Sequence, residues 1–104
     1  MAADPLDFQA TAYCEFGITK SGVVVSPGVV AADPKVLPLG SVVYVDVPKY
    51  RGVYQVMDTG RLIKGRRIDI YMRGYEQAIR FGRRPAKVTV LRYGYQGSWL
   101  DTAG

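Results

Sequence analysis

Short apolar segments rich in valine, isoleucine and tyrosine recur along this chain, and glycine or proline ends most of them. β-branched and aromatic residues favour strands, whereas glycine and proline favour turns. Residues 75–81 have helical character, and Gly82 follows them where glycine commonly ends a helix. The pattern predicts strands at residues 8–13, 23–25, 29–32, 42–47, 52–57, 68–71 and 86–93.

Six or seven strands at this close spacing, with one short helix, predict a mainly β fold that closes into a small barrel. A chain of 104 residues has the length of a single domain, and we expect one domain over residues 1–104 with a glycine-rich tail at 94–104. No apolar stretch approaches the roughly 20 residues that a membrane-spanning helix needs. The first residues lack the basic and apolar regions of a signal peptide.

Positive charge is concentrated in the second half of the chain. Residues 61–92 carry ten lysine and arginine side chains against Asp69 and Glu76, a balance of +8, whereas residues 1–60 sum to −2. Such a segment suits an anionic partner such as nucleic acid, an anionic membrane or a cell-wall polymer. A solvated basic face is the alternative interpretation. No nucleic-acid recognition motif accompanies the charge, so no nucleic-acid partner is expected.

Missing residue types exclude several chemistries. The chain has no histidine, which removes serine–histidine and cysteine–histidine catalysis and histidine metal sites. Cys14 is the single cysteine, so no internal disulfide can form, and a buried apolar role is expected for it. We predict no metal and no cofactor. Carboxylates remain as the candidate catalytic groups, with lysine, tyrosine, serine and threonine in support.

Asp58 and Asp69 stand out among the carboxylates because each lies at or in a predicted strand, eleven residues apart. A hairpin-like connection would place them side by side, and ionising two adjacent carboxylates is unfavourable, so one would keep its proton. A protonated carboxyl can act as a general acid. The structural alternative is that Asp58 caps the turn at Thr59-Gly60 and that Asp69 pairs with an arginine.

The tripeptide Asp58-Thr59-Gly60 also occurs in aspartic proteases, in which two aspartates share a proton and activate water. A chain with one such tripeptide would have to dimerise to supply the second aspartate. The basic residues that follow it match that class poorly.

A wider set of motifs resembles the 3D domain, the three-aspartate domain of membrane-bound lytic transglycosylase A and stationary-phase survival proteins. The resemblance covers about residues 10–93 and implies a six-stranded double-psi β-barrel. The matching segments are Ala10-Thr11-Ala12-Tyr13-Cys14, Val30-Ala31-Ala32-Asp33-Pro34, Pro38-Leu39-Gly40, Asp58-Thr59-Gly60, Ile63-Lys64-Gly65, Arg67-Ile68-Asp69-Ile70-Tyr71, and Ala78 with Phe81-Gly82.

The resemblance implies a lytic transglycosylase that cleaves peptidoglycan between MurNAc and GlcNAc and leaves a 1,6-anhydro product. It assigns Asp69 as the catalytic acid and then base, with Asp58 as its close partner and Asp33 as the third family aspartate. It also implies a location in the cell envelope or outside the cell, with glycan strands as the partner. The residues expected to contact the substrate are Thr11, Asp33, Thr59, Gly60, Lys64 and Gly65.

Two features depart from the family pattern. Arg61-Leu62 follow Gly60 where glycine and alanine are common, and a second cysteine near the first strand is absent. The chain also lacks the additional domain that forms the other wall of the larger enzyme's sugar groove. A non-catalytic module that binds cell-wall glycan is therefore an alternative, and the oligomeric state stays open.

Overall fold

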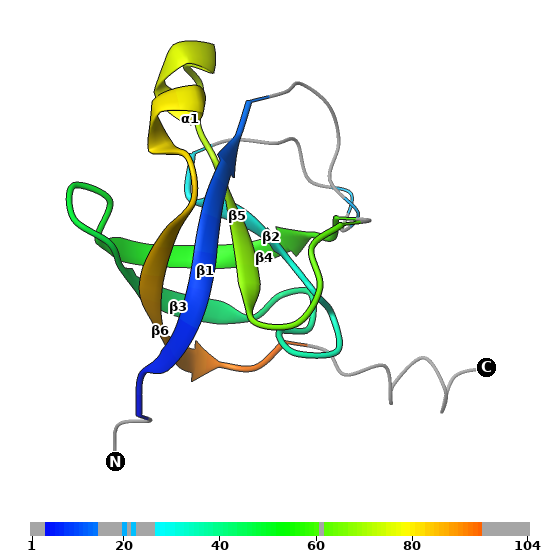
Figure 1. The fold of residues 1–104 in the computed structure, drawn as a ribbon. Helices are drawn as coiled ribbons and strands as arrows, with labels where there is room; N and C mark the ends of the chain where they lie inside the picture. The colour runs from blue at the N-terminus through cyan, green and yellow to red at the C-terminus, as the bar shows by residue number, and fades with distance from the viewer. Residues whose placement is uncertain (1–3, 15–19, 21, 23–26, 61, 95–104) are drawn as a thin grey trace.

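The computed structural model describes residues 4–14, 20, 22, 27–60 and 62–94. In this part of the chain six strands form a closed barrel and one helix lies at an end of it (Figure 1). The elements are β1 (Leu6–Tyr13), β2 (Val29–Ala32), β3 (Val42–Asp46), β4 (Gly52–Asp58), β5 (Arg67–Tyr71), α1 (Tyr75–Phe81) and β6 (Arg84–Arg92).

Around the barrel the strands follow the order β1-β5-β2-β4-β3-β6, and β6 pairs with β1 to close it. Two neighbouring pairs are parallel, β1 with β5 and β2 with β4, whereas the other four pairs are antiparallel. The mainly β fold with six barrel strands and one short helix confirms the prediction from the sequence. Closure leaves these strands without an open edge that could pair with another chain.

Side chains alternate between the barrel interior and its surface, as the period of a strand requires. On β5, Ile68 and Ile70 are buried in the core while Asp69 between them is only half-buried. β3 shows the same alternation, with Val43 and Val45 fully buried. The interior is therefore apolar, and the candidate chemical groups lie on the outer wall.

The predicted strands match the structure with small shifts at their ends. The first strand begins at Leu6 and the last at Arg84, and the helix has the predicted bounds, with Gly82 at a φ of 63° after it. The strand predicted at residues 23–25 lies outside the described residues, as does all of the predicted tail after Gly94. Among the described residues, no helix has the length and apolar character needed to span a membrane.

The hairpin expected between Asp58 and Asp69 is wrong. β4 and β5 do not pair with each other, because β2 lies between them, parallel to β4 and antiparallel to β5. Residues 59–60 and 62–66, the crossing segment, therefore pass over the end of β2, where the Gly65 N–H donates to Asp33, instead of making a tight turn. Local turn residues could not reveal this, since the intervening strand comes from a segment about 30 residues earlier in the chain.

The β3–β4 hairpin turns sharply at Pro48 and Lys49. The Tyr50 N–H donates to the Val47 carbonyl at 2.9 Å, and Lys49 has a φ of 74°. Proline at the second position and a positive φ at the third are the features of a type II turn, which favours glycine at that third position.

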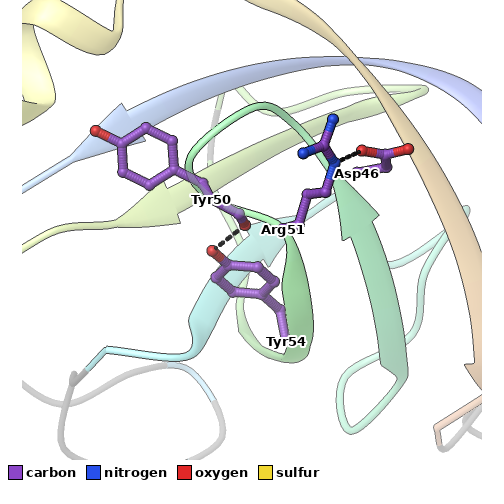
Figure 2. Close-up of polar contacts among 4 residues, drawn as sticks. All are labelled: Asp46, Tyr50, Arg51 and Tyr54. Atoms are coloured by element: carbon purple, nitrogen blue, oxygen red, sulfur yellow. Dashed lines mark hydrogen bonds and ion pairs between the residues drawn. The ribbon is translucent and has the colours of Figure 1, made fainter.

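Two polar contacts lie at this hairpin, one within the arm after the turn and one between the two arms (Figure 2). The Tyr54 hydroxyl donates to the Tyr50 carbonyl at 2.7 Å, and Arg51 Nε pairs with Asp46 Oδ1 at 2.5 Å. Burial raises the pKa of the Tyr54 phenol, and the neighbouring Tyr50 raises it further. The phenol therefore stays protonated as a donor at neutral pH.

Replacing Lys49 with glycine should stabilise the protein. Glycine adopts a positive φ without strain. The strain removed from the folded state outweighs the conformational entropy that glycine adds to the unfolded chain. We expect Lys49→Gly to raise the free energy of unfolding by up to about 1 kcal/mol in urea denaturation. Lys49→Ala, which removes the same charge but keeps a Cβ, should give no such gain. Equal stabilisation by both variants would contradict this explanation.

Candidate active site

Four side chains form a row across the outer wall of the barrel. Thr11 on β1 pairs in register with Asp69 on β5, and Asp69 pairs with Ala31 on β2. Ala31 in turn pairs with Asp58 on β4, just after a register shift between Val30 and Ala31. Residues directly opposite each other on paired strands face the same side. The row therefore presents the two aspartates on one face, with alanine between them.

Ala31 opens a pocket between the two aspartates. Adjacent strands lie about 4.8 Å apart, so two spacings separate the Asp58 and Asp69 backbones by about 10 Å. The alanine methyl fills little of this gap, and a pocket with a volume of about 170 Å³ remains. Its lining residues are Tyr13, Cys14, Ala31, Asp58, Thr59, Gly60 and Asp69.

Thr11 fixes the orientation of Asp69. Its hydroxyl donates to Asp69 Oδ1 at 2.9 Å, and the Ile68 carbonyl lies farther from that hydroxyl, at 3.4 Å. Because β1 and β5 are paired along their lengths, the backbone holds this donor beside the carboxyl group. Thr11 was expected to contact substrate, and the structure places it against the candidate acid.

Asp58 is held by backbone donors from two segments. Its Oδ1 accepts from the Thr59 N–H at 2.9 Å and from the Lys20 N–H at 3.0 Å. The first contact agrees with the turn-capping role considered for Asp58. The second ties it to the connection between β1 and β2. Two donors on one oxygen set the direction of the carboxylate as it reaches the pocket.

Gly60 forms part of the pocket wall and could carry no side chain there. A Cβ on Gly60 would lie 2.4 Å from Cγ1 of Ile63, which is itself buried. The Ile63 N–H donates to the Gly60 carbonyl at 3.0 Å, which closes a short turn. This turn starts the segment that crosses over β2.

Asp33 secures the other end of the crossing segment. It follows β2, is 7% exposed, and accepts from the Gly65 N–H at 2.8 Å and from the Lys35 N–H at 3.0 Å. Asp33 and Gly65 are not among the pocket-lining residues, nor is the exposed Lys64. These contacts give Asp33 a structural role, and direct contact between substrate and any of these three residues stays a prediction.

Tyr13, Cys14 and Ala31 line the pocket although they were not among the predicted site residues. Tyr13 packs edge-on against Tyr71 with 5.6 Å between ring centroids. Cys14 packs against the core but is only half-buried, and its thiol donates to the Arg73 carbonyl at 3.1 Å, so it is less buried than expected. Strand alternation from Thr11 would have placed Tyr13 on the same face. Only the strand pairing in the structure shows that Ala31 lies between the two aspartates.

The family model of the 3D domain matches residues 28–92. This chain belongs to the 3D domain family. The match includes β2, β4 and β5, so it contains Asp33, Asp58 and Asp69. The resemblance seen in the sequence is thereby confirmed.

Other proteins share this 3D domain or its fold. The cell wall-binding protein YocH of Bacillus subtilis (strain 168) is 35% identical over 99 residues, which cover 86% of this chain and 33% of YocH. The chain thus spans about a third of this curated relative's length. Escherichia coli MltA, a lytic transglycosylase solved with bound chitohexaose, superposes with a TM-score of 0.65 at 24% identity, covering 78% of this chain and 29% of MltA.

A further solved structure with the same fold is a Streptomyces papain inhibitor, at a TM-score of 0.69 and 15% identity. The match covers 88% of this chain and 97% of the inhibitor. At these identities the solved structures establish a shared fold for the barrel.

The contacts of Asp33 predict a loss of stability in acid. The Gly65 and Lys35 N–H groups hold the pKa of Asp33 below its ordinary value of 3.8, and the nearby Lys64 and Lys35 charges act in the same direction against the effect of burial. A carboxyl whose pKa is lower in the folded state stabilises the fold above its unfolded pKa, and this contribution disappears as pH falls through the folded pKa.

We therefore expect Asp33→Asn to be less stable than wild type at neutral pH and to lose less stability below about pH 4. Urea denaturation at a series of pH values measures both effects. Asp4→Asn, which removes the same charge near the N-terminus, is the control and should keep the wild-type acid dependence. A parallel offset of Asp33→Asn at every pH would contradict this role for its ionised form.

Proposed function

We propose that this domain is a peptidoglycan lytic transglycosylase that cleaves the bond between MurNAc and GlcNAc. The observation that carries the proposal is one pocket in which Asp69 and Asp58 flank the small Ala31. Membership of the 3D family supports it, as does the fold shared with MltA. The partner is then the glycan strand of the cell wall, and the site of action is the cell envelope or the cell exterior.

In the proposed reaction Asp69 acts twice. Its protonated carboxyl gives a proton to the glycosidic oxygen, the bond from C1 of MurNAc to that oxygen breaks, and GlcNAc leaves with a free hydroxyl. The Asp69 carboxylate then takes the proton from the C6 hydroxyl of MurNAc while that oxygen bonds to C1. The 1,6-anhydro ring forms without water, because the internal hydroxyl is already close to the reacting carbon.

Thr11 and Asp58 support this chemistry in different ways. By donating to Asp69 Oδ1, Thr11 makes that oxygen an acceptor and directs the acid proton to Oδ2. Asp58, on the other side of Ala31, supplies negative charge toward the carbon that becomes positive as the bond breaks. The two donors on Asp58 Oδ1 hold that charge in a fixed direction.

The remaining predicted residues serve as walls and contacts. Thr59 and Gly60 line the pocket, and the bare Gly60 backbone lets a sugar approach closely. Tyr13 also lines this pocket. Asp33 and Gly65 keep the crossing segment in position, and the exposed Lys64 on that segment can reach polar groups of the glycan.

A cell-wall binding module is the second candidate function. YocH is named a cell wall-binding protein and is 35% identical to this chain. The pocket of about 170 Å³ is also smaller than the roughly 300–1,000 Å³ of a typical small-molecule site, so it holds only a short part of a glycan. In this alternative the same residues bind the glycan and no bond is cleaved.

The aspartic protease alternative gains no support from the pocket. Such an enzyme joins two Asp-Thr-Gly segments, whereas here Asp58 shares its pocket with Asp69, which lies in an Arg-Ile-Asp-Ile-Tyr strand of the same chain.

Asp69→Asn separates the enzyme from the binding module. Asparagine keeps the size and a hydrogen-bond acceptor but cannot donate an acidic proton, so we expect at least about a 100-fold loss of anhydro-product formation. Mass spectrometry of digested peptidoglycan measures the product, and pelleting with insoluble peptidoglycan should be retained. Equal digestion by wild type and variant would remove Asp69 as the acid. Binding by both proteins without digestion by either would establish the module.

Thr11 should act on turnover more than on binding. Thr11→Val keeps the shape but loses the donor to the neutral Asp69 carboxyl, and a hydrogen bond of this kind contributes about 0.5–1.5 kcal/mol, so kcat should fall about 2- to 10-fold with little change in KM. Thr11→Ser restores the hydroxyl and should recover most of the activity. Equal activity of the valine and serine variants would show that Thr11 does not position Asp69.

A further inference from the structure

Two loops that each carry a lysine meet at the carboxylate of Asp33. The Lys35 N–H donates to Asp33 Oδ1 at 3.0 Å, and the N–H of Gly65, the residue after Lys64, donates to Oδ2 at 2.8 Å. One carboxyl group therefore fixes the backbone at both lysines. Because both loops end on the same anchor, Lys35 and Lys64 are neighbours in the fold although they lie 29 positions apart in the sequence.

The positive charges of this pair remain available to a ligand. Both lysines are exposed, and neither forms an ion pair within the described part of the chain. Both oxygens of Asp33 already accept backbone N–H groups, and those bonds are the main cause of its lowered pKa, with smaller effects from the Lys64 and Lys35 charges. The pair of lysines with one ionised aspartate therefore leaves a local charge of +1.

The lysine pair lies next to the pocket. Asp33 is two residues beyond Ala31, so along β2 it is about 7 Å from the alanine between the two aspartates. Lys64 belongs to the same crossing segment as Thr59 and Gly60, which line the pocket. A polymer that places one sugar in the pocket can therefore place a group of the adjoining unit at the lysines.

We propose that Lys35 and Lys64 form a carboxylate-binding subsite for the peptide side chains of the glycan. The inference rests on the proposed function, since it assumes that the pocket holds a cell-wall sugar. A carboxylate is repelled by Asp58 and attracted by the two lysines, so its position fixes which way the glycan lies across the pocket. The subsite thus selects glycan that carries anionic peptides over neutral glycan.

Binding of GlcNAc–MurNAc disaccharide-peptides tests this subsite without cleavage, because these ligands contain no MurNAc–GlcNAc bond. The matched ligand is the same disaccharide-peptide after its free carboxyl groups are converted to carboxamides. Each exposed ion pair contributes modestly, so wild type should bind the carboxylate form about five- to tenfold more tightly in calorimetry at low salt. Raising the salt concentration should reduce that preference.

The Lys35→Gln/Lys64→Gln double variant should bind the two forms with nearly equal affinity. Lys49→Gln is the matched control, because it removes one lysine at the β3–β4 turn, on the opposite side of the barrel from the crossing segment (Figure 1). This control should keep the wild-type preference. Equal binding of both ligands by wild type, or a full preference in the double variant, would overturn the proposal.

The binding and cleavage measurements together distinguish failure of the subsite from failure of the proposed function. Equal binding of both ligands by a wild-type protein that forms anhydro products would overturn the subsite and leave the lytic activity in place. A preference that depends on the two lysines in a protein that cleaves nothing would support the subsite and overturn the lytic activity.

Discussion

The insertion of β2 between β4 and β5 is the constraint on which the candidate site depends. Parallel pairing on one side and antiparallel pairing on the other bring Asp58 and Asp69 into one row with Ala31. A hairpin would have put the two carboxylates on adjacent strands, about 5 Å apart, with no room for a sugar between them. The intervening strand sets the separation, and the alanine on it leaves the space.

The same arrangement explains why so many of the polar contacts are to backbone groups. A segment that crosses over a strand end leaves N–H groups without ladder partners, and buried donors need acceptors. Asp33 accepts from one N–H of this segment, at Gly65, and Asp58 accepts from another, at Thr59. Each aspartate also accepts an N–H from a different loop, Asp33 from Lys35 and Asp58 from Lys20. Two of the three family aspartates thus hold loops around the pocket, whereas Asp69 accepts a hydrogen bond from the Thr11 side chain.

Negatively charged and positively charged side chains lie next to each other around the site. The two aspartates line the pocket, and the loops that carry Lys35 and Lys64 meet at Asp33, two residues beyond Ala31. Elsewhere on the barrel the described ion pairs join exposed groups, such as Arg51 with Asp46, and contribute little to stability. The lysines beside the pocket differ because a bound polymer can bring its own negative charge to them.

The sequence by itself determined the strands, the helix, the closed barrel and the three aspartates. The strands, the helix and the barrel follow from local rules: β-branched runs, turn residues, and the alternation that buries Ile68 and Ile70 while leaving Asp69 outside. The set of three aspartates came from the resemblance to the 3D domain. Only the tertiary structure decided which strands are neighbours, because pairing depends on contacts between distant segments. In the tertiary structure β2 lies where a hairpin was expected, and Ala31 on it lines the pocket. Thr11 donates to Asp69, and Asp33 accepts hydrogen bonds from the loops.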